Sequence, residues 1–189
     1  MRREIGHMFM KKHLFIVLIL CLFILIPVAV SDAVVDIDTI TLRHRVRDGE
    51  TLWFIAVLYG TTVREILLQN NLLSDVIVLG QELVVTSGER DMVASWYGKW
   101  FNGKPTASGI IFSSRDTLVA HKKLPLGSWV EITNPDTGVR VKVQVLDRGP
   151  YIRGREFDLS ERTAEILGMK AEGVKRLKVR ILSLPDQSS

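Results

Sequence analysis

The chain has 189 residues, with 25 Lys and Arg against 21 Asp and Glu, and a formal net charge of +4 at pH 7. This length accommodates one medium domain or two small ones. The single cysteine excludes an intrachain disulfide. Two of the four histidines, His7 and His13, lie in the predicted leader, residues 1–31, and the remaining two cannot build a Cys/His metal site, so we expect neither a metal nor another cofactor.

An export signal is predicted over residues 1–31. A basic start precedes an uncharged apolar run, residues 14–30, and small residues follow it, which is the pattern of a signal peptide. The alternative is an uncleaved inner-membrane anchor through residues 14–30, a length at the short edge of what spans a bilayer. Cys21 follows Leu20 inside the apolar run, so we do not expect a lipoprotein. In either case the rest of the chain is exported, to the periplasm or cell envelope.

Most of the charge excess belongs to this leader. It holds four of the basic residues and one of the acidic residues, which leaves the exported part close to neutral. Because no basic stripe remains, we expect no nucleic-acid partner.

The segment that begins at residue 42 predicts a strand, two helices and a returning strand. After an Asp-Gly turn, apolar residues recur with the spacing i, i+3, i+4, i+7 of one helix face. Gly60 is positioned to end this helix, and Thr62 with Glu65 forms a capping box for the second helix.

This segment, "VRDGETLWFIAVLYGTTVREILLQNNL" followed by "IVLGQELVV", resembles a LysM domain, placed at residues 42–86. The resemblance implies a βααβ fold that binds N-acetylglucosamine-containing glycan in a shallow groove. Carried onto this chain, two facing loops line the groove with Gly49, Glu50, Thr51, Leu52, Ile77, Val78 and Gly80. Thr51 and Leu52 could instead only cap and pack the first helix.

Residues 92–182 predict several short strands and one late helix. The clearest strand is 139–147, in which every second residue is a valine until Asp147 falls in the apolar register. A carboxylate there needs a partner or a cavity. For the helix, Asp158 with Glu161 fits a capping box, and Ser160 is a rival cap. Mainly short strands favour a small closed β-barrel.

The segments "ASWYG", "TASG", "LVAHKKLPLGSWVEITN", "VLDRGPY" and "FDLSERTAEILGM" together resemble the RlpA family. That resemblance implies a six-stranded double-psi β-barrel over residues 92–182. It also implies endolytic lytic transglycosylase activity on peptidoglycan, which cleaves MurNAc–GlcNAc bonds to 1,6-anhydroMurNAc ends in cell-wall remodelling and daughter-cell separation. The expected partner is the peptidoglycan glycan strand.

Such a reaction needs a group that protonates the glycosidic oxygen and a base for the muramoyl 6-hydroxyl, and one carboxyl can serve both in turn. Asp147 is the first candidate, or else a structural carboxylate paired with Arg148. Asp158 is the second, because related expansin-type barrels carry their key aspartate in a similar F-D-L-S, although it could be a helix cap. His121 occupies the family's H-x-x-L-P position and could orient or relay a proton, or be structural.

Further residues are expected to contact the substrate. Aromatic side chains at Trp96, Tyr97 and Trp100 could stack on sugar rings, with core packing as the alternative for Trp96. The resemblance adds three polar residues to the substrate-binding set, Thr106, Ser108 and Arg148.

One position departs from the family pattern T-A-S/N-G-E. Ile110 stands where that family carries a glutamate in its proposed active site, and isoleucine can neither donate, accept nor hold charge. The alternative function is therefore a non-catalytic peptidoglycan-binding protein. A third hypothesis is a hydrolase or expansin-like wall-loosening protein that uses Asp158.

Overall fold

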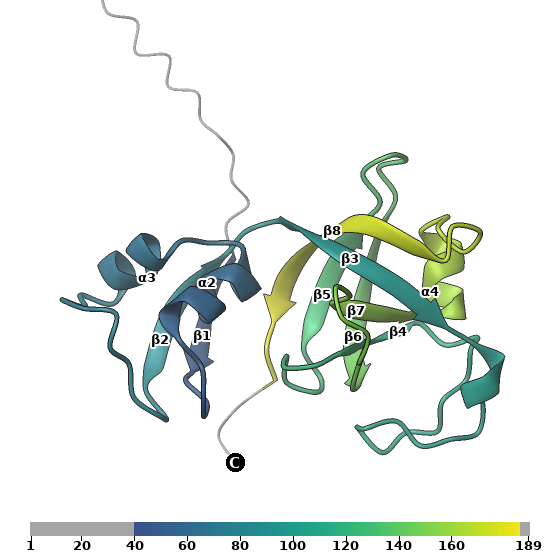
Figure 1. Cartoon of the computed structure of the whole chain (residues 1–189), viewed down its shortest axis with the longest axis horizontal. Helices are drawn as coiled ribbons and strands as arrows, with labels where there is room; N and C mark the ends of the chain where they lie inside the picture. The colour runs from purple at the N-terminus through teal and green to yellow at the C-terminus, as the bar shows by residue number, and fades with distance from the viewer. Residues whose placement is uncertain (1–39, 186–189) are drawn as a thin grey trace, which may run out of the picture. The chain divides into compact units, whose positions relative to one another are not determined.

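The computed structural model describes residues 40–185, so the predicted leader and Cys21 lie outside the described residues. The first module is a two-stranded antiparallel sheet with two helices, in the order β1 (Ile40–Arg45), α2 (Leu52–Tyr59), α3 (Val63–Gln69) and β2 (Glu82–Ser87). Both helices pack against β2 (Figure 1). The predicted βααβ arrangement is confirmed.

The caps of these helices follow from the sequence. Gly60 ends α2 in the left-handed conformation, with φ 65°, a region that glycine enters without steric cost. Thr62 and Glu65 form the predicted capping box at the start of α3. Asn70 then joins the end of α3 to β2, because its side chain bonds both N–H and C=O of Val84. The chain reversals of the module are therefore locally encoded.

The second module is a closed barrel with the strand order β3-β7-β4-β6-β5-β8. Its elements are β3 (Arg90–Tyr97), the 3₁₀ turn η1 (Lys99–Phe101), β4 (Leu118–His121), β5 (Trp129–Thr133), β6 (Arg140–Asp147), β7 (Phe157–Ser160), α4 (Glu161–Ile166) and β8 (Val174–Ser183). β3 and β7 are parallel, as are β4 and β6, and the other neighbouring pairs are antiparallel. The predicted six-stranded barrel is confirmed.

Several bounds differ from the expectation. The polar segment 86–91, where the sequence passes from one predicted module to the next, is mostly strand, because β2 runs to Ser87 and β3 begins at Arg90. The capping box of Asp158 with Glu161 is wrong. Asp158 lies within β7, and the rival cap, Ser160, accepts a hydrogen bond at its Oγ from the Thr163 N–H. The pairing of β7 with β3 and β4 overrides the local helix-start signal.

Within the described residues, no single helix is long and apolar enough to cross a membrane. The pair α2 and α3 passes by length and composition together, but the two helices are bent by 101° at the break between them.

Candidate functional site

Three neighbouring strands bring two carboxylates to one end of the closed barrel, which we call its Asp147 edge. Ala120 of β4 pairs with Asp147 of β6 on one side and with Asp158 of β7 on the other. Cross-strand partners share a face of the sheet, so Asp158 projects on the same side as Ala120. The register of β4 and β6 shifts between Val119 and Ala120, where Leu146 is an extra residue in β6. This bulge takes Asp147 out of the alternation of the preceding valines and makes it the partner of Ala120. Ser95 of β3 pairs with Asp158 and extends this row.

Asp147 is held mainly through one of its carboxylate oxygens. Oδ1 accepts hydrogen bonds from the backbone N–H of Ala107 at 2.9 Å and of Arg148 at 2.8 Å. Among residues 40–185, Oδ2 has only a long contact, 3.4 Å from the Tyr97 hydroxyl. The carboxylate is therefore oriented by backbone, and Oδ2 remains able to accept a closer partner.

Arg148 does not pair with Asp147 through its side chain, contrary to the alternative considered from sequence. Its guanidinium Nη1 donates to the backbone carbonyls of His121 at 3.1 Å and Leu124 at 2.9 Å. This side chain ties the loop after β6 to the loop after β4. Its predicted contact with substrate stays a prediction.

The hydroxyl of Tyr97 is influenced by the charges of both aspartates. Burial, the Asp147 charge and hydrogen bond, and the Asp158 charge raise the pKa of its hydroxyl, so the phenol stays protonated and can donate. Its ring stacks on Phe112, with centroids 4.6 Å apart. The structure thus places Tyr97 beside Asp147, with its hydroxyl rather than its ring face turned to the carboxylate.

Asp158 has different surroundings from Asp147. Its Oδ1 accepts a short hydrogen bond from the Ser95 hydroxyl. Burial raises the pKa of the carboxyl, against the opposing effects of Ser95 and of the positive charge of Arg155. Two carboxyls on one barrel edge with different environments are a recurrent arrangement for acid–base work.

We predict that Asp158→Asn makes the protein more stable at pH 7. A carboxyl whose pKa is raised in the folded state binds its proton more tightly in the folded than in the unfolded chain. Its contribution to the free energy of unfolding therefore falls as the pH rises above 3.8, the pKa of the unfolded side chain. Asparagine has no such titration and can still accept from Ser95. Thermal denaturation from pH 3 to 8 should show a higher Tm for the variant at pH 7, and a difference that closes towards pH 3.

The matched control is Asp116→Asn, at an exposed aspartate of the same barrel. It should leave the pH dependence of Tm unchanged. A variant Asp158→Asn that melts below the wild type at pH 7 would contradict the prediction and indicate that the ionised carboxylate stabilises the fold.

His121 lies on β4 next to Ala120, so its side chain points to the opposite face from the two aspartates. It is 6% exposed, and its Nδ1 accepts from the backbone N–H of Lys123 at 3.1 Å and Leu124 at 2.8 Å. Burial and nearby Arg90, Arg148 and Lys122 lower the imidazole pKa to about 3. A neutral ring whose Nδ1 is engaged by the chain favours the structural alternative over a proton relay.

The loop between β3 and β4, visible in Figure 1, contacts Asp147 through its backbone. Ala107 bonds Asp147, the Ser108 N–H donates to the Leu146 carbonyl at 3.1 Å, and Thr106 Oγ1 lies 3.0 Å from Ser108 Oγ. Ile110 closes a tight turn, since its carbonyl accepts from the Thr106 N–H, and its side chain is 41% exposed. A polar residue at position 110 would therefore carry little burial cost.

The other two aromatic candidates, Trp96 and Trp100, differ in burial. Trp96 packs against the core and donates its indole N–H to the Lys170 carbonyl at 3.1 Å, which fits the packing alternative. Trp100 is 91% exposed on η1. Within residues 40–185, no three His, Cys, Asp or Glu side chains form a group that could hold a metal ion.

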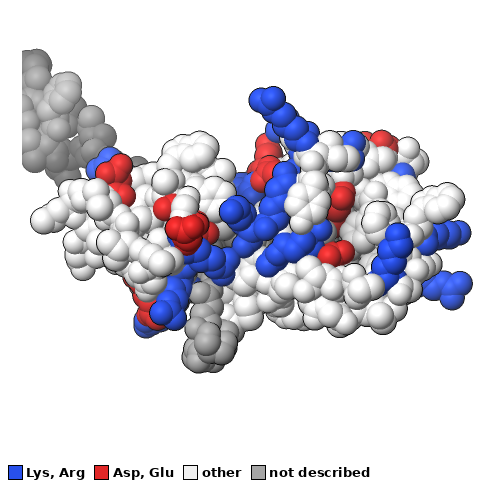
Figure 2. All heavy atoms as spheres, turned by 60° about the horizontal axis from the view of Figure 1, so that its bottom comes forward, with Lys and Arg blue, Asp and Glu red and all other residues white. Residues whose placement is uncertain are grey.

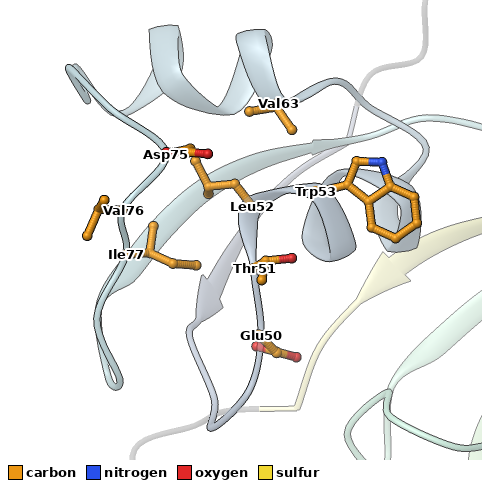
Figure 3. Close-up of a pocket in the computed structure, with 8 residues that line it drawn as sticks. All are labelled: Glu50, Thr51, Leu52, Trp53, Val63, Asp75, Val76 and Ile77. Carbon is orange, nitrogen blue, oxygen red and sulfur yellow. The ribbon is translucent and has the colours of Figure 1, made fainter.

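The first module has a groove of about 310 Å³ between its two loops, lined by Glu50, Thr51, Leu52, Trp53, Val63, Asp75, Val76 and Ile77. Figure 3 shows the Leu52 side chain pointing towards the loop that bears Asp75, whereas the Trp53 indole points away from that loop. Thr51 also caps α2, accepting from the Phe54 N–H, and Leu52 is buried. Thr51 therefore caps the helix and Leu52 packs in the core, and both also line the groove; their contact with glycan stays a prediction.

The groove differs in part from the expected set. Four predicted residues line it, but Gly49, Val78 and Gly80 do not, and Trp53, Val63, Asp75 and Val76 were not anticipated. The sequence signal for Trp53 was its place directly after the predicted lining residues. Glu50 turns inward, where Oε2 accepts from His44 Nε2 at 2.8 Å and from the Arg47 N–H at 2.9 Å. This carboxylate anchors its loop.

Both modules of the chain match known protein families. Residues 90–179 match the family described as "Lytic transglycolase", and residues 44–86 match the LysM domain. The "Probable endolytic peptidoglycan transglycosylase RlpA" of Aquifex aeolicus (strain VF5) is 47% identical over 89 residues, which are 47% of this chain and 39% of that protein. The "Endolytic peptidoglycan transglycosylase RlpA" of Pasteurella multocida (strain Pm70) is 43% identical over 98 residues, 52% of this chain and 33% of that protein.

These matches cover only part of each relative, since this chain spans 39% and 33% of the two proteins. Among solved structures, apo Clavibacter michiganensis expansin aligns with a TM-score of 0.42 and 20% identity, over 54% of this chain and 53% of that chain. A likeness at this level carries no argument about function.

Proposed function

We infer that this chain, which carries a LysM domain followed by an RlpA-like double-psi β-barrel domain of the lytic transglycosylase type, is an exported enzyme that cleaves peptidoglycan glycan strands. It would break MurNAc–GlcNAc bonds within the strand and leave 1,6-anhydroMurNAc ends, in wall remodelling and daughter-cell separation. The LysM domain would hold the same polymer through its groove.

The observation that carries this proposal is the pair of carboxyls beside Ala120. Asp147 Oδ1 is held by backbone N–H groups, whereas Oδ2 has only a long contact with the Tyr97 hydroxyl among the described residues and can accept a proton from substrate. In contrast, burial raises the pKa of Asp158. Acid–base catalysis works best when one group holds its proton and another has lost it. Two neighbouring aspartates in unlike surroundings support this division of roles, with Asp158 as the acid and Asp147 as the base, in a chain that has no glutamate at position 110.

In the proposed reaction, protonated Asp158 donates to the glycosidic oxygen as the C1–O4 bond breaks. Asp147 accepts the proton of the muramoyl 6-hydroxyl, and O6 closes on C1 to form the anhydro ring. No water enters the products. The reaction exchanges the protonation states of the two aspartates, and proton exchange with solvent restores them. Tyr97 stays protonated throughout, with its hydroxyl 3.4 Å from Oδ2 of Asp147.

The test is to incubate the exported part with purified glycan strands and analyse the products by mass spectrometry. An anhydro end is lighter by one water than the product of hydrolysis, so the two reaction classes are separated directly. Anhydro ends support the transglycosylase. Reducing ends support the hydrolase hypothesis, and intact strands that remain bound support the non-catalytic binding protein.

Ile110 favours that binding protein as the second candidate, and a single substitution addresses it. If the missing glutamate limits the chemistry, Ile110→Glu should raise anhydro-end formation by about 10²-fold, the usual contribution of one positioned acid or base. The side chain at 110 is partly exposed, so the variant should fold normally. The neighbouring Ile111→Glu, at a more exposed position, is the control and should leave the rate unchanged.

A further inference from the structure

The barrel edge that carries Asp147 also carries a group of basic side chains. β4 and β6 are parallel neighbours, so the loops that follow them leave the barrel at the same edge. These two loops hold what we call the basic rim, which comprises Lys122, Lys123, Arg148, Arg153 and Arg155. Figure 2 displays a face of the molecule on which Lys and Arg side chains gather.

In the described part of the chain, the side chains of the basic rim are not engaged in ion pairs, although Arg148 interacts electrostatically with Asp147 and Arg155 with Asp158. Within residues 40–185, none of its five members takes part in an ion pair with an aspartate or glutamate side chain. The acidic residues of the same edge are Asp147 and Asp158 of the site and Glu156, which already pairs with Arg90 at 2.7 Å. Two cations elsewhere on the barrel, Lys170 and Lys175, are each paired twice, whereas Lys142 and Arg176 take part in none of these ion pairs.

The two loops of the basic rim are joined to each other. Lys122 Nζ donates to the Arg155 carbonyl at 3.3 Å, and the Arg148 guanidinium donates to two carbonyls of the strand and loop on the β4 side. Lys122, Lys123 and Arg153 are exposed and Arg155 is half-buried. The two loops are thus joined by Lys122 and Arg148, and the exposed side chains of the rim remain accessible to a ligand.

We propose that the basic rim binds the carboxylates carried by muramoyl residues of a glycan strand that lies along the Asp147 edge. N-acetylglucosamine is uncharged, whereas each muramoyl residue bears a lactyl group that ends in a carboxylate or continues into a peptide with carboxylates of its own. Several unpaired cations beside the site therefore select an anionic strand over a neutral one and speed its association. The inference rests on the proposed glycan substrate.

Binding is tested with the full exported part carrying Asp147→Asn, so that strands are not consumed. The ligands are peptide-free glycan strands and the same strands with their lactyl carboxylates converted to neutral amides. At low salt the protein with an intact rim should bind the native strands roughly fivefold to tenfold more tightly, since exposed charge pairs are individually weak but several act together. The preference should shrink at high ionic strength.

Two matched sets of substitutions separate the rim from net charge. Lys122→Gln with Arg153→Gln should bring native and amidated strands to within about twofold of each other. Lys142→Gln with Arg176→Gln removes the same charge from exposed positions on other parts of the barrel, with residue 142 about 16 Å along β6 from Asp147, and should keep the preference. Arg148 stays unchanged in both sets, because its guanidinium holds two backbone carbonyls.

Equal affinity for native and amidated strands would overturn the proposal, as would an equal loss in the control set. Strands with intact stem peptides distinguish the source of the carboxylates, since lactyl recognition predicts tighter binding of the peptide-free strands. The outcome is independent of catalysis. A protein that yields no anhydro ends, yet shows the charge preference, would refute the proposed enzyme and leave the basic rim standing.

Discussion

Asp147→Asn is expected to reduce anhydro-end formation by about 10²- to 10⁴-fold, the range for loss of a positioned acid or base. Asparagine keeps the shape of the side chain and can still accept at Oδ1 from the Ala107 and Arg148 N–H groups. It cannot take the proton of the muramoyl 6-hydroxyl. Initial rates on purified glycan strands, with products identified by mass, measure the effect.

Control measurements distinguish a loss of catalysis from a loss of folding or binding. The variant should retain the Tm of the wild type and its affinity for chitooligosaccharides, because neither the barrel strands nor the LysM groove is altered. Asp116→Asn should keep full activity. An Asp147→Asn protein that works at more than about a tenth of the wild-type rate would exclude Asp147 as the base.

His121→Ala is expected to lower the free energy of unfolding by about 2–4 kcal/mol. It leaves the N–H groups of Lys123 and Leu124 without their acceptor, and it opens a cavity where the ring contacts Phe157. That is a large share of the stability of a typical domain. Urea denaturation at pH 7.5, followed by circular dichroism, measures the loss.

His121→Asn separates the structural role from catalysis. Its side-chain oxygen can accept from the same two N–H groups, so it should recover part of the stability and, if the histidine is structural, most of the activity. An asparagine variant that is stable yet inactive would contradict the structural role and restore the proton relay as an explanation.

The pH dependence gives a further readout for the same residue. With a folded-state pKa of about 3 against 6.5 for the free side chain, the unfolded chain binds more protons between these values. Stability should therefore fall as pH drops below 6.5. His121→Asn lacks this titration, so the gap between wild type and variant should narrow as pH falls from 7 to 4.

Much of the local structure was predictable from neighbouring residues. The caps at Gly60, Thr62 and Ser160, and the alternation of β6, are set by groups within a few positions of each other. The strands β4 and β7 were not recognised by their own pattern. Each has only four residues, and all four of β4 are buried, so no two-residue period was available.

The candidate site, too, was predictable from the sequence only in part. Motif positions predicted that Asp147, Asp158 and His121 matter, but their roles depend on which strand lies beside which. Only the barrel order places Ala120 between the two aspartates and turns His121 to the other face. A helix cap at Asp158 and an ion pair between Asp147 and Arg148 were also consistent with the sequence.

The sequence alone determined the two modules, their fold classes and the positions of the candidate site residues, because these depend on local periodicity and on motifs. The tertiary structure decided the orientation and environment of each group. Arg148 is directed to backbone carbonyls, and the cations of two distant segments meet at one edge. These outcomes depend on pairing between strands far apart in the chain and on burial, which sequence spacing does not encode.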